Sequence, residues 1–189
     1  MSILKNYSPW ILALLWLGIR WICHTTILPN DPDTARSIGV MANLFFIIVL
    51  MFQTLMTLYK ERRNGLTGSF MSDIKRVAFP AMKYVLGAGI AITIYYTTIS
   101  DELDVKRNQD YEALEATLDT PEKLQKVIAE NTQLKGYTKE QIMSAAKERT
   151  DLFTNAKVVS SASFLVLIFV TLFYSLFAVF LFRNFLKLK

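Results

Sequence analysis

The chain has 189 residues, about the length of one domain. Its hydrophobic fraction of 52% excludes an intrinsically disordered protein, and its single Cys and single His exclude a disulfide framework and a dedicated zinc site. The net charge is +5, but only 20% of the residues are charged and the apolar residues occur in long runs. This distribution favours a membrane protein over a nucleic-acid-binding protein.

Four apolar runs are long enough to cross a bilayer, whose core requires about 20 mainly apolar residues. They are residues 9–28, 38–59, 79–99 and 161–182. We therefore predict an all-α fold, a four-helix transmembrane bundle that forms one integral membrane domain. The first run follows Lys5 as in a signal peptide, but Arg20 interrupts it and no small-residue cleavage pattern precedes Pro29, so we interpret it as a retained span.

The basic residues predict the orientation of the bundle, because Lys and Arg are retained on the cytoplasmic side of short loops. The amino-terminal tail, the segment from the second run into the third, and the carboxyl tail hold ten basic residues and only two acids, Glu61 and Asp73. The ten are Lys5, Lys60, Arg62, Arg63, Lys75, Arg76, Lys83, Arg183, Lys187 and Lys189. The segment after the first run instead holds Asp31 and Asp33 against Arg36. We expect both termini to be cytoplasmic.

Residues 100–160 form a polar segment far longer than a connection between two spans requires. The segment holds nine basic and twelve acidic residues, and by the predicted topology it lies outside the cytoplasm. Its single Pro and single Gly are too few for a flexible linker. We therefore predict an extended extracytoplasmic helical hairpin.

The first arm of this hairpin is expected to continue the third span, since nothing between Gly89 and Asp119 breaks a helix. An apolar stripe of Tyr111, Leu114 and Leu118 runs along this arm, and we expect it to pack inside the hairpin.

A short helix over residues 121–134 is predicted near the tip. Thr120 and Pro121 form a typical helix start, and Gly136 a natural stop. Thr138 and Gln141 then form a capping box that opens the second arm, which we expect to run without a break into the fourth span.

The tip helix carries Leu124, Val127 and Ile128 on one face. This face either packs inside the hairpin or is left for a partner protein, and the sequence does not favour one over the other. An interfacial helix on the membrane surface is a third alternative, weakened by a polar face that mixes acids with Lys123 and Lys126.

Polar residues inside the spans define a candidate intramembrane site of Arg20, His24, Asn43 and Gln53. Arg20 and His24 are four residues apart and share a helix face. They form either a proton or anion site, or an anchor in which Arg20 extends outward to an acid near the outer surface, such as Asp101, Glu102 or Asp31. We favour the anchor. Asn43 and Gln53 are predicted to form interhelical hydrogen bonds.

Small residues predict close helix packing in two spans. Gly87 and Ala91 form a small-xxx-small pair in the third span, and Ser163 is one of the small residues that open the fourth.

Three stretches carry a resemblance to a known family. They are LTGSFMSDIKRVAFPAMKYVLGAGIAITIYYT, the insert with GYTKEQIMSAAKERTDLF, and the tail LFAVFLFRNFLK. Over roughly residues 60–189 the chain resembles a family of small four-span membrane proteins of Bacteroidota whose activity is not established. Span one departs from the family pattern, because Arg20 and His24 replace a Gly-rich apolar segment. The resemblance implies a bacterial inner-membrane location, with residues 100–160 in the periplasm.

No Walker loop, zinc motif or Gly-x-Ser-x-Gly motif occurs in the chain. The single His and single Cys are neighbours in sequence, so a nucleophile–base pair would have to be built from other residues. We therefore expect no enzyme, no cofactor, no metal site and no nucleic-acid partner. The expected partners are the lipid bilayer and either another envelope protein or further copies of the chain. The leading interpretation is a scaffold or accessory subunit whose hairpin contacts another envelope protein. The alternative is a small oligomeric transporter or channel.

Overall fold

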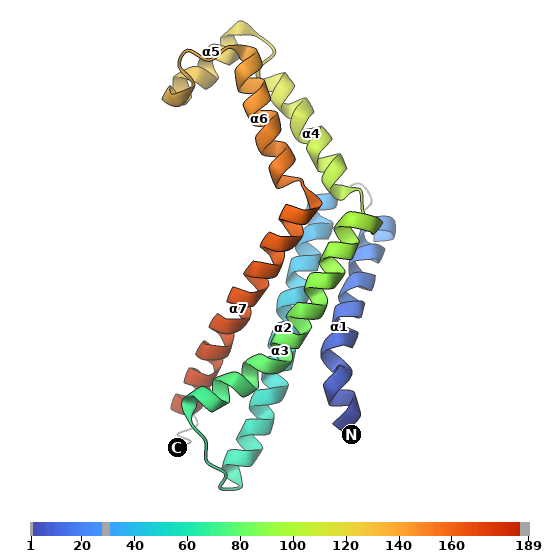
Figure 1. Cartoon of the computed structure of the whole chain (residues 1–189), viewed down its shortest axis with the longest axis vertical. Coiled ribbons are helices and arrows are strands. Elements are labelled where there is room, and N and C mark those ends of the chain that lie inside the picture. The colour runs from blue at the N-terminus through green and yellow to red at the C-terminus, as the bar shows by residue number, and fades with distance from the viewer. Residues whose placement is uncertain (1, 28–30, 186–189) are drawn as a thin grey trace.

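The computed structural model describes residues 2–27 and 31–185, and every regular element in this part of the chain is a helix (Figure 1). Four of the helices are long and apolar enough to cross a membrane, which confirms the predicted all-helical class and the four candidate spans. They are α1 (Ser2–Ile22), α2 (Pro32–Arg63), α3 (Phe70–Ile94) and α7 (Ala156–Phe185). Leu28, where the first run was predicted to end, and the basic residues Lys187 and Lys189 lie outside the described residues.

Both α1 and α3 end in a single π-helical turn, which the sequence did not predict. These turns are η1 (Cys23–Ile27) and η2 (Tyr95–Ile99), and they lie at the same end of the bundle. A π turn holds one more residue than an α turn and occurs often at functional sites, because it redirects the side chains that follow.

Helix α3 is the central helix of the bundle and packs against α1, α2 and α7 (Figure 1). Small side chains allow this, since Ala78, Ala81, Ala88 and Ala91 are buried along its length. The first turns of α3 bend away from the rest of the helix in Figure 1. Pro80 lies inside α3, and its ring nitrogen cannot donate the usual helical hydrogen bond, which favours such a bend.

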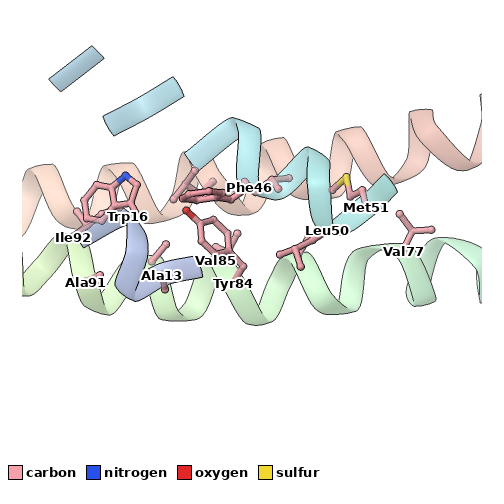
Figure 2. Close-up of a cluster of buried hydrophobic side chains, with 14 of the residues drawn as sticks. Ala13, Trp16, Phe46, Leu50, Met51, Val77, Tyr84, Val85, Ala91 and Ile92 are labelled. Carbon is pink, nitrogen blue, oxygen red and sulfur yellow. The ribbon is translucent and has the colours of Figure 1, made fainter. Parts of the chain in front are cut away.

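The core of the bundle is a continuous cluster of apolar side chains between these helices. Figure 2 shows Phe46 and Leu50 of α2 facing Tyr84 and Val85 of α3. Trp16 of α1 closes one end of the cluster and donates from its indole nitrogen to the carbonyl oxygen of Gly39 at 2.8 Å.

The residues predicted to support close packing lie at helix contacts. A Cβ atom added to Gly87 would lie 3.0 Å from Cβ of Ala13 in α1, and Ala91 is buried. On another side of α3, a Cβ atom on Gly89 would lie 2.6 Å from Cδ2 of Phe164 in α7. Ser163 of α7 is only half-buried.

Gly89→Ala is therefore expected to lower the free energy of unfolding by about 1–3 kcal/mol, because the ring of Phe164 must move away from α3. Gly18→Ala is the matched control, since a Cβ atom at Gly18 in α1 has open space around it. The control is expected to change stability by no more than about 1 kcal/mol, and in the stabilising direction, because Ala favours helix over Gly. Thermal unfolding in detergent measures both, and equal losses would contradict the proposed α3–α7 contact.

Three helices form the polar segment, and two of them pair as the arms of a hairpin. The helices are α4 (Glu102–Thr117), α5 (Pro121–Glu130) and α6 (Lys139–Phe153). Helices α4 and α6 contact each other along their length, with α5 at their tip (Figure 1). The hairpin rises from one end of the bundle, which we call the hairpin end. Helix α1 begins and α7 ends at the opposite end.

The arms are not continuous with the spans, so two sequence predictions are wrong. Between η2 and α4, Ser100 is extended, and its Oγ accepts a hydrogen bond from the amide of Glu102. Between α6 and α7, Oδ1 of Asn155 accepts hydrogen bonds from the amides of Lys157 and Val158, which starts a new helix. Side-chain acceptors such as these bind the first amides of a new helix and so interrupt a helix that would otherwise continue. The prediction considered only Gly and Pro as helix breakers and therefore missed both interruptions.

The helix starts at the tip match the prediction better than the helix stop. Thr120 caps α5 and the Thr138–Gln141 capping box opens α6, as predicted. Helix α5 ends at Glu130 rather than at residue 134, because Asn131 is extended and its Oδ1 binds the amide of Gln133 in a separate 3₁₀ turn, η3 (Thr132–Leu134). Gly136, with φ of +89°, lies in the turn before α6.

Candidate functional site

Arg20 lies near the hairpin end of α1 and is 1% exposed. Its Nη2 donates to Oε2 of Glu102 at 2.6 Å. The carbon atom at the centre of the guanidinium lies 4.7 Å from the centre of the Tyr95 ring, a cation–π geometry. Arg20 therefore pairs with an acid at this end, as predicted. However, the side chain is buried and does not extend to the surface.

Glu102 is the residue that brings the hairpin and the bundle together. It is 4% exposed although it belongs to a polar segment, and its Oε1 accepts a hydrogen bond from the hydroxyl of Tyr95 at 2.7 Å. Its position in the first turn of α4 also suits a carboxylate, since the amino end of a helix carries partial positive charge. The base of the hairpin is therefore tied to α1 and to the end of α3 by one buried side chain.

His24 lies at the edge of the same cluster, one turn beyond Arg20 in η1. Its Nε2 is 3.2 Å from Oδ1 of Asp101, and its Nδ1 is 3.4 Å from Oε1 of Glu102. The side chain is 18% exposed, so it lies between the buried ion pair and the surface. We call Arg20, His24, Tyr95, Asp101 and Glu102 the hairpin-base cluster.

The two amides of the predicted site have different environments. Asn43 is buried in α2, and its Oδ1 accepts a hydrogen bond from the hydroxyl of Tyr84 in α3 at 2.5 Å. This is an interhelical bond of the kind that the sequence predicted. Gln53 is exposed on the surface of α2, and its side chain makes no hydrogen bond within the described part of the chain, because that face of α2 turns away from the other helices.

A cavity of about 360 Å³ lies at the hairpin end, between α1, α2, α3 and α7. Its polar lining comes from Arg20, Asn43, Ser163, Arg36 and Tyr96. Its other walls are mostly apolar, and Phe153 from the end of α6 also contributes to the lining. The structure therefore places Arg20, Asn43 and Ser163 around one space, whereas Gln53 does not line it.

The candidate partner face lies on α5. Leu124, Val127 and Ile128 are each half-buried, so none is fully covered by the rest of the hairpin. No residue of α5 whose burial is described is fully buried. In the predicted stripe of Tyr111, Leu114 and Leu118, Tyr111 and Leu114 are also half-buried, whereas Leu118, directly after the end of α4, is 1% exposed.

Polar contacts join the two arms of the hairpin. The hydroxyl of Tyr111 donates to Oδ1 of Asp151 at 2.5 Å, and this hydrogen bond to a carboxylate raises the pKa of the tyrosine. Nζ of Lys147 binds Oε1 of Glu115 at 2.9 Å. At the start of α6, hydrogen bonding to backbone amide and hydroxyl groups lowers the pKa of Glu140. The contacts of Tyr111 and Lys147 therefore hold α4 and α6 together.

The sequence analysis missed a second buried acid, at the opposite end of the bundle. Asp73 of α3 is 1% exposed. Its Oδ1 binds Nη2 of Arg62 in α2 at 2.6 Å, and its Oδ2 binds Nη2 of Arg183 in α7 at 2.9 Å. Arg183 also donates to the carbonyl oxygen of Gly68. The available signal was that Asp73 is one of only two acids among ten basic residues at the expected cytoplasmic end, which indicates ion pairs. The charges at this end were interpreted only as evidence of topology.

In the part of the chain that the structure describes, no three His, Cys, Asp or Glu side chains are grouped so that they could hold a metal ion. The acids nearest to one another at the hairpin base have other partners, since Glu102 binds Arg20 and Asp104 binds Arg107 at 2.8 Å. The polar groups of the site are arranged to hold helices together and to line the cavity.

Comparison of the chain with protein-family models, with curated proteins and with solved structures finds no match. The resemblance to a Bacteroidota family therefore stays a prediction.

Proposed function

We propose that the chain is a scaffold or accessory subunit of a bacterial inner membrane whose hairpin contacts another envelope protein in the periplasm. The observation that carries the proposal is a half-exposed apolar face on α5, held away from the bundle on a hairpin with a fixed base. The proposal assigns no catalytic role to the chain, and its orientation, with cytoplasmic termini, depends on the distribution of Lys and Arg.

The fixed base supports the proposal because a docking surface is most useful when its position is defined. Helix α4 has 16 residues, which corresponds to roughly 24 Å at 1.5 Å per residue. Its first turn is tied to the bundle by Glu102, and its length is joined to α6 by the pairs of Tyr111 and Lys147. Binding to a preorganised surface loses less conformational entropy than binding to a mobile segment.

The form of the α5 face indicates what kind of partner would fit. Leu124, Val127 and Ile128 follow the spacing by which one helix packs into an apolar groove or against another helix. The opposite face carries Lys126, which is exposed and, among the described residues, forms an ion pair only with Glu130 of its own helix. We therefore expect an envelope protein that presents an apolar helical stripe or groove.

Photo-crosslinking in intact membranes tests this proposal. A photoreactive amino acid in place of Leu124 or Ile128 is expected to give an adduct with a different protein, and the same group in place of Lys126 is expected to give little or none. Adducts of equal yield from both faces would contradict a specific docking face. An adduct of twice the mass of this chain would indicate association of identical copies instead.

A small oligomeric transporter or channel is the second candidate function, favoured by the cavity that Arg20 and Asn43 line. Flux of small anions into proteoliposomes that contain the wild-type protein would support this function. Absence of flux from well-folded protein would leave the scaffold as the better explanation of the hairpin.

A further inference from the structure

The cavity at the hairpin end combines an arginine-lined polar region with apolar walls. The polar side holds Arg20 and Arg36, with the amide of Asn43 and the hydroxyl of Ser163. The walls include Ile92, Val159, Val166 and Leu167. A space of this kind suits an amphiphile that has an anionic head and a hydrocarbon tail.

Arg20 provides the observation that points to a ligand. Its Nη2 is bound to Glu102, but its Nη1 is buried and has no hydrogen-bond partner among the described residues. Buried polar groups in proteins are nearly always hydrogen-bonded, and a guanidinium prefers an oxyanion as its partner. The side chain is 1% exposed, so its position does not result from contact with bulk solvent.

Arg36 provides a second positive charge at the same cavity. Its side chain is exposed on α2, and it makes no ion pair within the described part of the chain. Glu102 neutralises one of the two arginines, so the cavity keeps an excess of one positive charge. A ligand with a single negative charge would balance it.

The position of the cavity at one end of the membrane-spanning bundle favours a lipid as the source of this anion. Most of the lining residues belong to the last turns of α1 and α3 and to the first turns of α2 and α7, at the hairpin end, while Tyr96 comes from η2 and Phe153 from the end of α6. Trp21 is exposed on α1 at this level, as is typical of residues at a membrane–water interface. The head group of a lipid in the adjacent leaflet would lie at the height of the two arginines.

We propose that this cavity binds the phosphate group of an anionic phospholipid from the leaflet at the hairpin end. Arg20 and Arg36 contact the phosphate oxygens, and the apolar walls formed by α3 and α7 contact the start of one acyl chain. This site is separate from the partner face on α5, and neither proposal depends on the other.

Native mass spectrometry and thermal shift of the full chain in detergent test the proposal with four probes. They are phosphatidylglycerol, phosphatidylcholine with the same acyl chains, diacylglycerol with the same acyl chains, and inorganic phosphate. Phosphatidylglycerol is expected to bind at least about tenfold more tightly than diacylglycerol, which lacks the phosphate that accepts a charge-assisted hydrogen bond. It is also expected to bind more tightly than phosphatidylcholine, because the choline cation of that lipid cancels the negative charge that would balance the cavity. Equal binding of the three lipids would overturn the proposal, and so would inorganic phosphate that competes with phosphatidylglycerol at similar concentration.

Three variants separate the site from general surface charge. Arg36→Gln is expected to weaken phosphatidylglycerol binding about tenfold. Lys157→Gln removes an exposed charge at the start of α7 that does not line the cavity, and it is expected to have little effect. Ala162→Phe fills the cavity from the exposed side of α7 without a change in charge, and it is expected to abolish binding.

The unfolding temperature without added lipid provides the folding control, and all three variants are expected to match the wild type. Equal weakening by Arg36→Gln and Lys157→Gln would overturn the proposal, as would full binding by Ala162→Phe.

Discussion

Replacing Arg20 by Met is expected to lower the free energy of unfolding by about 3–5 kcal/mol, the usual loss when one partner of a buried ion pair is removed. Glu102 would then keep a buried carboxylate whose remaining close partner is the Tyr95 hydroxyl, beside the edge contact of His24. The carboxylate would draw water into the hairpin base or pull the first turn of α4 outward. Thermal or denaturant unfolding in detergent measures the loss, and faster amide hydrogen exchange in the first turn of α4 would locate it.

Two further variants show whether the loss comes from this pair. Arg107→Met removes an arginine from a partly exposed pair with Asp104 and is expected to lower stability by at most about 1 kcal/mol. Combining Arg20→Met with Glu102→Leu is expected to recover much of the loss, because no unpaired buried charge remains. If the double variant were no more stable than Arg20→Met, the cost would come from lost packing rather than from the unpaired carboxylate.

Replacing Asp73 by Asn is expected to have an effect of similar size, about 3–5 kcal/mol, at the opposite end of the bundle. The carboxylate of Asp73 lies between Arg62 and Arg183, so its loss leaves two guanidinium groups near each other without a counter-charge. Helices α2, α3 and α7 meet through this residue. Thermal unfolding measures the loss. Crosslinking between the carboxyl ends of α2 and α7 is expected to decrease if the two helices separate.

Glu61→Gln is the matched control for Asp73→Asn. Glu61 binds Arg76 through two hydrogen bonds of 2.6 and 2.8 Å, but Arg76 is exposed and Glu61 is partly exposed. Solvent screens such a pair, so its loss is expected to change stability by no more than about 1 kcal/mol. Equal losses from the two variants would show that burial of Asp73 is not what makes its ion pairs important.

The two buried acids have the same task at opposite ends of the bundle. Glu102 of α4 holds Arg20 of α1, and Asp73 of α3 holds arginines of α2 and α7. One network fixes the base of the hairpin and the other fixes the other end of the spans. A scaffold that presents a face at the tip of a projection requires both its membrane part and its hairpin base to keep their geometry.

Local patterns in the sequence determined the helical elements of this protein. The four spans follow from the length and hydropathy of their own residues, and the starts of α5 and α6 follow from Thr120 and from the Thr138–Gln141 box. The packing role of the stripe on α4 also follows from its spacing, as the buried Leu118 shows. The helix starts depend on neighbours within about one helical turn, and the spans depend on runs of about 20 consecutive residues, so no knowledge of distant contacts was required.

Only the tertiary structure decided which polar residues meet. Arg20 and Glu102 are 82 positions apart, and Asp73 and Arg183 are 110 positions apart. From the sequence, Glu102 was one of several acids that could pair with Arg20. Asp73 entered only the count of charges that predicted the cytoplasmic side. Likewise, hydropathy could not distinguish Asn43, which faces α3, from Gln53, which faces away from the bundle. The rotation of each helix depends on the packing of all the helices together, because a side chain is buried only when a partner from another helix covers it.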